Sequence, residues 1–296
     1  TGHTGGFWED YRYVRVAENG GVRFIFLDCG RSLSNFRTTL LASVLVALSG
    51  LLAVFLLLLI LSKRIVRPVA ESYEKQKRFI TDAGHELKTP LTSIMGYAEI
   101  MENGIVKPED VAPFAGKIRA EAVRLLTLIE DIIRLSQLDE GGAPAPFEPV
   151  ELLALCGTVR DRLQHKAAAH KVTLAVTGKP VTAQAQRRTL EQMVFNLADN
   201  AVAYNRAGGS VTIEAGAEGG APFIRVSDTG IGIAPADQAR VFERFYRVDK
   251  SHSKMTGGTG LGLSIVKHGA ALHHAKIELQ SALGVGTTIT LRFPKA

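Results

Sequence analysis

A long apolar run lies in the N-terminal part of the chain. From Thr38 to Ser62, 25 consecutive residues include no charged side chain. A helix of this length reaches about 37 Å at ~1.5 Å per residue, enough to cross a hydrocarbon core of about 30 Å with some tilt. A buried core helix seldom stays apolar on every face, and the apolar stretch of a signal peptide is shorter and lies at the very N-terminus. The pattern therefore predicts one transmembrane helix over residues 38–62.

Basic residues are distributed unequally on the two sides of this run. Three follow it closely, at Lys63, Arg64 and Arg67, and two precede it, at Arg31 and Arg37. Because Lys and Arg are concentrated on the cytoplasmic side of membrane spans, this contrast places residues from 63 onward in the cytoplasm and residues 1–37 outside.

Residues 1–37 contain two runs that are typical of β-strands, Tyr11–Ala17 and Val22–Asp28, joined by Glu-Asn-Gly-Gly. This connection predicts a hairpin. Two strands alone are only marginally stable in water, so we expect residues 1–37 to be the end of a larger, truncated extracytoplasmic region. The first residue is Thr1 rather than Met, which agrees with a fragment.

Apolar residues recur at seven-residue spacing in residues 63–140. In a predicted helix over residues 66–103, one series comprises Ile80, Leu87, Ile94 and Met101, and a second comprises Gly84, Leu91 and Ala98. After a turn at 103–108, a second predicted helix over 110–139 has a seam of Ile118, Ala122, Leu125, Ile129, Ile132 and Ser136. Two such helices form an antiparallel hairpin, which exposes much apolar surface when it is alone. We therefore expect a homodimer in which two hairpins form a four-helix bundle.

A linker at 141–146, Gly-Gly-Ala-Pro-Ala-Pro, precedes residues 147–296, in which helical and strand patterns alternate. The pattern predicts helices at 150–169, 186–204 and 260–273 and strands at 171–177, 210–215, 222–227, 275–281 and 286–293. A short glycine-rich turn between two of these strands favours a mixed sheet over a parallel one. The predicted fold class is multidomain α and α/β: a transmembrane helix, an antiparallel helical hairpin, and an α/β sandwich with a mixed sheet.

Composition and charge exclude several classes of protein. With 46% hydrophobic and 22% charged residues, the chain can bury a core, which excludes disorder and collagen-like repeats. Its two cysteines, Cys29 and Cys156, are too few for a disulfide framework or a four-cysteine zinc site. The net charge of +6 includes a surplus between Lys63 and Arg78 that follows the apolar run. A nucleic-acid-binding face would mix such a surplus with aromatic residues, so we expect no nucleic-acid partner.

His85 follows Gly84 of the seam, so we expect its side chain on the flank of the bundle. Pro90 cannot donate a hydrogen bond to the carbonyl of Glu86, and the helix should bend one turn after His85. A carboxylate at Glu86 can hold the imidazole in one tautomer and accept its proton as a ring nitrogen attacks an electrophile. For this dipeptide alone, the alternative is a solvated surface pair. A zinc-protease His-Glu-x-x-His motif is excluded because position 89 is Thr89.

Asn196 and Asn200 are four residues apart on a predicted helix and therefore share a face. An amide oxygen is a fair Mg²⁺ ligand when phosphates supply most of the charge. The alternative is an ordinary polar helix face.

Two glycine-rich segments follow. Asp-Thr-Gly-Ile-Gly at 228–232 comes after a strand, and Gly-Thr-Gly-Leu-Gly at 258–262 opens a helix, where backbone N–H groups can bind phosphate. Neither matches the dinucleotide-binding or Walker A pattern, and each alone is also consistent with a flexible loop. Between them, an aromatic and basic stretch at 241–247 precedes a polar loop at 249–258. This loop can close over a nucleotide as a lid, with Arg247 near the terminal phosphate.

The order of these motifs is more specific than any one of them. His-Glu-Leu-Lys-Thr-Pro-Leu begins at His85, and the asparagine cluster and the two glycine-rich segments follow it. In this order the chain resembles the membrane sensor histidine kinases of two-component systems, with a HisKA dimerisation helix pair and a GHKL-type ATP-binding domain, from about Val66 to Pro294. The resemblance implies a protein-histidine kinase in the plasma membrane of a bacterium, with its C-terminal kinase region in the cytoplasm. It also implies ATP and Mg²⁺ as cofactors and a cognate response regulator as partner, whose aspartate receives the phosphoryl group.

The resemblance further implies roles for individual residues. His85 would accept the γ-phosphoryl group, Glu86 would act as general base, and Thr89 would position a water in a phosphatase reaction on the regulator. Asn200, supported by Asn196, would bind Mg²⁺. The remaining roles concern the nucleotide: Asp228 at the adenine amino group, Gly230 and Gly232 close to the base, Tyr204 against the adenine, Arg247 near the terminal phosphate, and Gly258, Gly260 and Gly262 in the phosphate lid.

The chain departs from the family pattern in places. Ala203 stands where the family often has a basic residue, which removes one phosphate contact that Arg247 and Lys250 can replace. His-His-Ala at 273–275 replaces a frequent His-Gly-Gly, and a complete HAMP relay does not fit before the His85 helix. The absent basic residue leaves open a kinase-impaired receptor that acts as a phosphatase or scaffold. A chaperone or topoisomerase-type ATPase with the same nucleotide fold is opposed by the apolar run and by His85.

Overall fold

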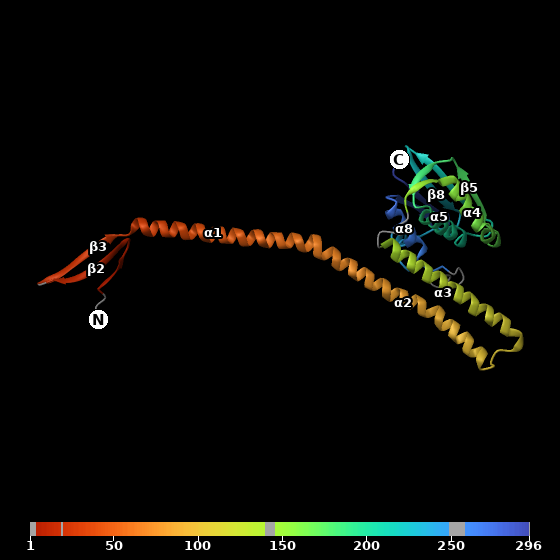
Figure 1. Cartoon of the computed structure of the whole chain (residues 1–296), viewed down its shortest axis with the longest axis horizontal. Coiled ribbons are helices and arrows are strands. Elements are labelled where there is room, and N and C mark those ends of the chain that lie inside the picture. The colour runs from red at the N-terminus through yellow and green to blue at the C-terminus, as the bar shows by residue number, and fades with distance from the viewer. Residues whose placement is uncertain (1–3, 19, 140–145, 249–257, 296) are drawn as a thin grey trace. The chain divides into compact units, whose positions relative to one another are not determined.

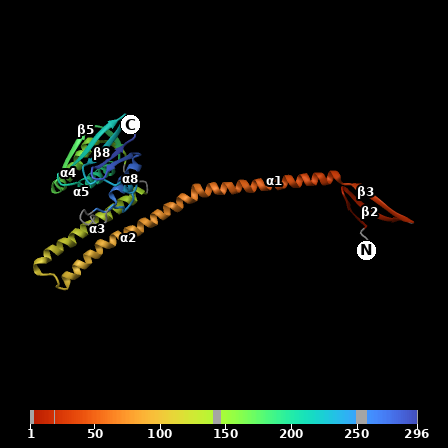
Figure 2. The same cartoon turned by 180° about the vertical axis from the view of Figure 1, so that it is seen from behind.

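The computed structural model describes residues 4–18, 20–139, 146–248 and 258–295. The chain divides into two compact units, Thr1–Lys77 and Arg78–Ala296. Figure 1 labels their helices and strands, and Figure 2 shows the same elements from behind. All but the last residue of the predicted linker at 141–146 lies outside the described residues.

The N-terminal unit contains a three-stranded antiparallel sheet. Its strands are β1 (Gly5–Trp8), β2 (Tyr11–Glu18) and β3 (Gly21–Asp28), in the order β1-β2-β3. Strands β2 and β3 confirm the predicted hairpin, whereas the sequence pattern did not predict β1. On one face, the ring of Tyr13 lies 6.2 Å from the rings of both Phe24 and Phe26. Cross-strand aromatic pairs of this kind stabilise a small sheet.

The apolar run forms helix α1 (Gly30–Leu61), which a π-helical turn, η1 (Ser62–Val66), follows directly. The helix begins before the predicted Thr38 because Asp28 Oδ1 accepts the N–H of Gly30 at 2.8 Å, which satisfies an amide that has no partner within the helix. None of its side chains is buried. Of the described helices, one is long and apolar enough to cross a membrane, and it contains this run.

Helices α2 (Arg67–Glu102) and α3 (Val111–Asp139) form the predicted pair, with a 3₁₀ turn, η2 (Pro108–Asp110), between them. Pro90 lies inside α2, which continues beyond it, and the expected bend stays a prediction. The predicted seam is incomplete, because the most buried apolar residues of α3 are Leu128 and Leu135, which it omits. These two pack with Leu261 and Ile265, and Leu87 and Ile132 of the predicted seam pack against the same cluster. Several apolar side chains of the pair stay exposed in the single chain, among them Ile80, Leu91, Met95, Val123, Leu126 and Ile133.

The C-terminal domain has a five-stranded sheet covered by helices. The helices are α4 (Leu152–Ala169), α5 (Arg187–Ala203), α6 (Pro235–Gln238) and α8 (Gly262–Leu272). The strands are β5 (Thr173–Gly178), β7 (Ser210–Glu218), β8 (Ala221–Asp228), β9 (Lys276–Ala282) and β10 (Gly286–Arg292), in the order β5-β7-β8-β10-β9. The β5–β7 pair is parallel and the other pairs are antiparallel, which confirms the predicted mixed sheet.

A second, two-stranded sheet was not predicted. It pairs β4 (Glu148–Glu151) with β6 (Thr182–Ala185), and Val150 lies opposite Ala183. The helix predicted from residue 150 therefore begins at Leu152. The carboxylate of Glu151 accepts the N–H groups of Leu153 and Ala154 at 2.8 and 2.7 Å and so caps this helix.

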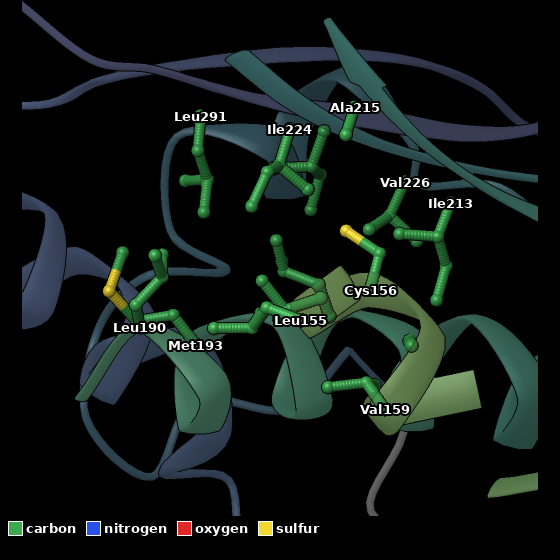
Figure 3. Packing of buried hydrophobic residues seen from close by; sticks show 14 of the residues in the cluster. Leu155, Cys156, Val159, Leu190, Met193, Ile213, Ala215, Ile224, Val226 and Leu291 are labelled. Atoms are coloured by element: carbon green, nitrogen blue, oxygen red, sulfur yellow. The ribbon is translucent and has the colours of Figure 1, made fainter. Parts of the chain in front are cut away.

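The core of the C-terminal domain lies between the sheet and helices α4 and α5 (Figure 3). Cys156 projects from α4 toward residues of β7 and β8, including Ile224 and Val226, and Leu155 and Val159 belong to the same cluster. Burial raises the pKa of the Cys156 thiol to about 12, so it stays protonated at neutral pH. Cys156 is therefore a packing residue and not a nucleophile.

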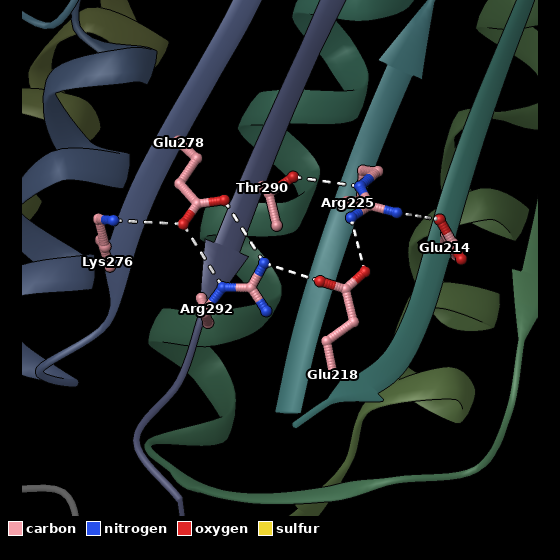
Figure 4. A network of polar contacts seen from close by, with 7 residues as sticks. All are labelled: Glu214, Glu218, Arg225, Lys276, Glu278, Thr290 and Arg292. Carbon is pink, nitrogen blue, oxygen red and sulfur yellow. Dashed lines mark hydrogen bonds and ion pairs between the residues drawn. The ribbon is translucent and has the colours of Figure 1, made fainter. Parts of the chain in front are cut away.

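The opposite face of the sheet carries a network of ion pairs (Figure 4). Arg225 donates to Glu214 at 2.9 Å and to Glu218 at 3.0 Å, and Arg292 donates to the second oxygen of Glu218 at 2.9 Å. The guanidinium of Arg225 also lies 4.8 Å from the ring of Phe223, which is 4% exposed. The network thus covers the ring of Phe223 on the face that the helices leave open. The hydrogen bonds from Arg292 and Arg225 also lower the pKa of Glu218.

His273 joins the end of α8 to the start of α5. The backbone N–H of Gln186 donates to its Nε2 at 3.0 Å, and its Nδ1 lies 2.7 Å from the carbonyl oxygen of Gly269. An Nε2 that accepts cannot carry a proton, so the ring is neutral with its proton on Nδ1. Burial is the main cause that lowers the pKa of His273.

This arrangement predicts acid-sensitive stability. A folded pKa below the unfolded value of about 6.5 means that the unfolded chain binds one more proton as the pH falls below that value. The free energy of unfolding should then decrease on acidification, with a limiting slope of about 1.4 kcal/mol per pH unit for one proton. Urea denaturation between pH 7.5 and 5, followed by circular dichroism, measures the slope. His273→Gln should flatten it, and His274→Gln, at an exposed neighbouring position, should not. Equal slopes in all three proteins would contradict this role.

Candidate functional site

His85 is exposed on α2, and Glu86 beside it is half-buried. The hydroxyl of Thr89, one turn later, donates to the carbonyl oxygen of His85 at 3.3 Å. These three residues line a shallow hollow on the helix together with Lys88, Thr92 and Ser93. Among the described residues no hydrogen bond joins Glu86 to the imidazole, so its orienting role stays a prediction. The ring is accessible to an incoming reactant, as its place on the flank predicts.

Asp228 ends strand β8 and is held in one orientation. Its Oδ1 accepts the N–H of Gly230 at 2.8 Å and that of Thr287 at 3.2 Å. Burial raises the pKa of Asp228 and outweighs these two bonds, which act in the opposite direction. Within the described part of the chain, Oδ2 takes part in no hydrogen bond. The carboxyl group therefore presents one fixed acceptor to a ligand.

The glycines after Asp228 allow the loop to lie directly on neighbouring backbone. A Cβ on Gly230 would lie 2.4 Å from the carbonyl oxygen of Tyr204, and one on Gly232, which has φ +68°, would lie 2.0 Å from that of Ala282. The N–H of Ile231 also donates to the Tyr204 carbonyl at 3.2 Å. Side chains at either glycine would displace the loop and, with it, Asp228.

The two asparagines of α5 lie in different surroundings, although both are half-buried. Asn196 donates to the carbonyl oxygen of Gly262 at 3.1 Å and accepts from Gln192 at 2.8 Å. The Asn200 side chain makes no hydrogen bond to any described residue. The predicted amide pair therefore divides into Asn196, which two described neighbours hold in place, and Asn200, which no described neighbour holds.

Arg247 lies on the glycine-rich side of the candidate site, close to Gly258 and Gly260. It is half-buried, and a Cβ on Gly258 would lie 3.9 Å from its Nη2 and 3.8 Å from the hydroxyl of Tyr204. Burial lowers the pKa of Arg247, whereas Tyr204 and the Glu86 carboxylate both raise it. Of the predicted lid at 249–258, Gly258 is described, and residues 249–257, which include Lys250, lie outside the described residues.

Gly260 and Gly262 differ in whether the backbone at their position requires a glycine. Gly260 has φ +74°, and a Cβ there would lie 3.0 Å from backbone atoms of Phe245. Gly262 begins α8 and is in ordinary contact with Asn196. Only the first of these two positions needs glycine for conformational reasons.

The sequence did not predict the contacts of α2 and α3 with the segment that leads into α8. The Thr259 hydroxyl donates to Asp131 at 2.8 Å, and Arg244 donates to Asp139 at 2.6 Å. Burial raises the pKa of Asp131. The ring of Phe79 stacks on that of Phe245 at 5.9 Å. The available signal was the seven-residue spacing of Leu128 and Leu135, which defines a second apolar face on α3.

Family comparisons agree with this arrangement. Residues 185–296 match the family of histidine kinase-, DNA gyrase B- and HSP90-like ATPases, and residues 75–141 match the His Kinase A phospho-acceptor domain. The sensor-like histidine kinase SenX3 of Mycolicibacterium smegmatis is 40% identical over 223 residues, which are 74% of this chain and 58% of SenX3. The phosphate regulon sensor protein PhoR of Pseudomonas aeruginosa is 35% identical over 238 residues, which are 79% of this chain and 53% of PhoR.

Solved structures of histidine kinases are similar to this chain as well. Histidine kinase AdeS of Acinetobacter baumannii has a TM-score of 0.58 at 25% identity, over 71% of this chain and 98% of AdeS. ShkA in complex with AMPPNP has a TM-score of 0.55 at 29% identity, over 74% of this chain and 46% of ShkA. The chain spans about half the length of the curated relatives it matches. With a HisKA domain that carries His85 and an ATPase domain that carries Asn200 and Asp228, the chain belongs to the family of sensor histidine kinases.

Proposed function

We propose that this chain is an ATP-dependent protein-histidine kinase that phosphorylates itself on His85. A ring nitrogen of His85 attacks the γ-phosphorus of ATP, the bond from that phosphorus to the β–γ bridging oxygen breaks, and ADP leaves. Glu86 accepts the ring proton. The phosphoryl group then passes from His85 to an aspartate of a response regulator.

The observation that carries this proposal is the contact between the helix pair that carries His85 and the glycine-rich segment, where the Thr259 hydroxyl donates to Asp131 at 2.8 Å and Leu128 packs with Leu261. Arg247 lies beside Tyr204 and Gly258 on the nucleotide side, and Glu86 directly follows His85 on α2. A cation on the nucleotide side is suited to stabilise the charge of a phosphoryl group in transfer. Asp228 supplies the acceptor for the adenine amino group, with Gly230 and Gly232 holding the loop beneath it.

The residues present fit a nucleotide-bound Mg²⁺. No cluster of three or more His, Cys, Asp or Glu that could hold a metal occurs in the described ranges. An ion here would take most of its ligands from phosphates and water, with the amide oxygen of Asn200 as the protein ligand. Bound in this way, Mg²⁺ would neutralise charge on the phosphates.

The rest of the chain suits a dimeric sensor in a bacterial plasma membrane. The apolar α1 would span the bilayer once, with the basic residues after it in the cytoplasm. The exposed apolar residues of α2 and α3 would be covered by the same hairpin of a second copy. The solved complex of histidine kinase ThkA with response regulator protein TrrA is an example of the expected partnership.

The kinase proposal is tested with the purified chain in detergent or lipid nanodiscs and γ-labelled ATP. The protein should acquire acid-labile, alkali-stable label with Mg²⁺ and none after chelation by EDTA. Addition of a receiver domain should move the label to that domain. A preparation that binds ATP with normal affinity but stays unlabelled would favour the kinase-impaired receptor, for which Ala203 is the supporting feature.

We also propose that Thr89 supports dephosphorylation of the regulator, since its hydroxyl lies one turn from His85 on the same hollow. Thr89→Ala should keep autophosphorylation within about threefold, because the hydroxyl does not contact the transferred group in the forward reaction, and lose most phosphate release from a phosphorylated receiver. Thr92→Ala, in the same hollow, is the matched control. Equal phosphate release by wild type and Thr89→Ala would remove this role.

A further inference from the structure

The two asparagines of α5 have different partners, and this difference assigns them different roles. We infer that Asn196 is a positioning residue that ties α5 to the first turn of α8, that Gln192 fixes its orientation, and that Asn200 alone is the amide ligand of the metal. The inference rests on the proposed ATP site and specifies how its two sides are kept in register.

The orientation of the Asn196 amide follows from its partner. The carbonyl oxygen of Gly262 can only accept, so the group 3.1 Å from it must be the Nδ2 of Asn196. Oδ1 then faces Gln192, which must present its own NH₂ group at 2.8 Å. A single backbone carbonyl therefore determines both side-chain amides, which are otherwise ambiguous.

The same two bonds fix the orientation of the Asn196 amide. Oδ1 of Asn196 accepts from Gln192 through one of its two lone pairs, and turning the amide toward another ligand would break the bond to Gly262. Asn200 lies one turn further along α5 on the same face and has no such bond to a described residue. The pair predicted from spacing alone thus separates into one structural amide and one available amide.

The position of Gly262 in the fold indicates what the hydrogen bond from Asn196 does. Gly262 is the first residue of α8, directly after the Gly-Thr-Gly-Leu segment, where helix N–H groups have no partner within the helix. A Cβ on Gly262 would lie 3.7 Å from the Cβ of Asn196, so the two helices are in contact there. Further along, Gly269 packs against Met193 so closely that a Cβ would lie 2.6 Å from its sulfur. The Asn196 bond therefore sets the distance from the metal ligand on α5 to the phosphate-binding amides of α8.

The test uses Gln192→Glu, which keeps the size of the side chain but removes its donor. Two carboxylate oxygens facing Oδ1 of Asn196 would turn that amide over and place its oxygen against the Gly262 carbonyl. ATP binding, measured by calorimetry on the full chain with saturating Mg²⁺, should weaken about tenfold, the effect of one lost hydrogen bond with a repulsive contact. Gln280→Glu, at an exposed position of β9, controls for the added charge.

A second readout separates positioning from ligation. At saturating ATP, the Mg²⁺ concentration that gives half the heat of binding should change less than about twofold in Gln192→Glu and in Asn196→Ala, and rise clearly in Asn200→Ala, because one ligand is lost only there. Gln192→Leu removes the donor without a charge and serves if the glutamate variant does not fold. If Asn196→Ala shifts the Mg²⁺ requirement as much as Asn200→Ala does, Asn196 is a metal ligand and the inference is wrong. Calorimetry needs no phosphoryl transfer, so absence of kinase activity leaves this test intact, whereas absence of ATP binding by wild type would overturn the proposed function itself.

Discussion

Replacing His85 by Gln should lower phosphoryl incorporation from γ-labelled ATP by at least about a thousandfold, because the reacting nitrogen is removed. Gln keeps a polar side chain of similar length on an exposed helix face, so the fold of α2 should not change. ATP affinity should stay within about twofold, since the groups assigned to the nucleotide lie on α5, on α8 and after β8. The variant thus separates binding from chemistry.

The matched control is His165→Gln, at an exposed position of α4. It removes one imidazole from the chain and should leave the incorporation of label unchanged. Label that survives in His85→Gln at the wild-type level would show that another residue is the phosphoacceptor.

Asp228→Asn should weaken ATP binding about a hundredfold, the range expected when a buried polar contact is replaced by a mismatched one. The substitution keeps Oδ1, which can still accept the N–H groups of Gly230 and Thr287 at the loop. It replaces Oδ2 by an NH₂ group, which would face the amino group of adenine donor to donor. Equilibrium binding of ATP measures the loss, and the thermal midpoint of the variant shows whether the fold is kept.

Inosine triphosphate supplies the control ligand for Asp228, because an oxygen replaces the adenine amino group. Wild type should bind it more weakly than ATP, and Asp228→Asn should reduce or reverse this preference. If the variant loses both nucleotides equally, Asp228 supports the loop and does not read the base. In that case the assignment of the adenine contact fails, although the kinase reaction does not.

Local patterns in the sequence predicted the elements that local interactions form. The seven-residue series found α2 and α3, because each seam repeats within one helix. In the same way, the Glu-Asn-Gly-Gly connection at 18–21 predicted the β2–β3 hairpin. The β4–β6 pair was missed because Val150 and Ala183 are far apart in sequence, and residues 148–151 run directly into a helix. Pairing between distant segments overrides the local preference there.

The site was predicted at the level of residue types more completely than at the level of contacts. Asn196 and Asn200 share a face, as their spacing requires, but only the Gly262 carbonyl distinguishes them. Gln192, four residues before Asn196, was a signal of the same kind that the sequence analysis did not use. Thr259 lies in the glycine-rich segment, yet its bond to Asp131 depends on a contact between α3 and α8 that no motif encodes.

The central claim is that the phosphoryl group of ATP is transferred to His85. It is tested most directly by incubating the chain with ATP and Mg²⁺, digesting it at neutral to alkaline pH, and locating the phosphoryl group by mass spectrometry with fragmentation that preserves phosphohistidine. The account predicts a phosphoryl group on His85 that disappears on mild acid treatment. A phosphoryl group on Thr81, Thr89 or another residue, or none in a preparation that binds ATP, would contradict it.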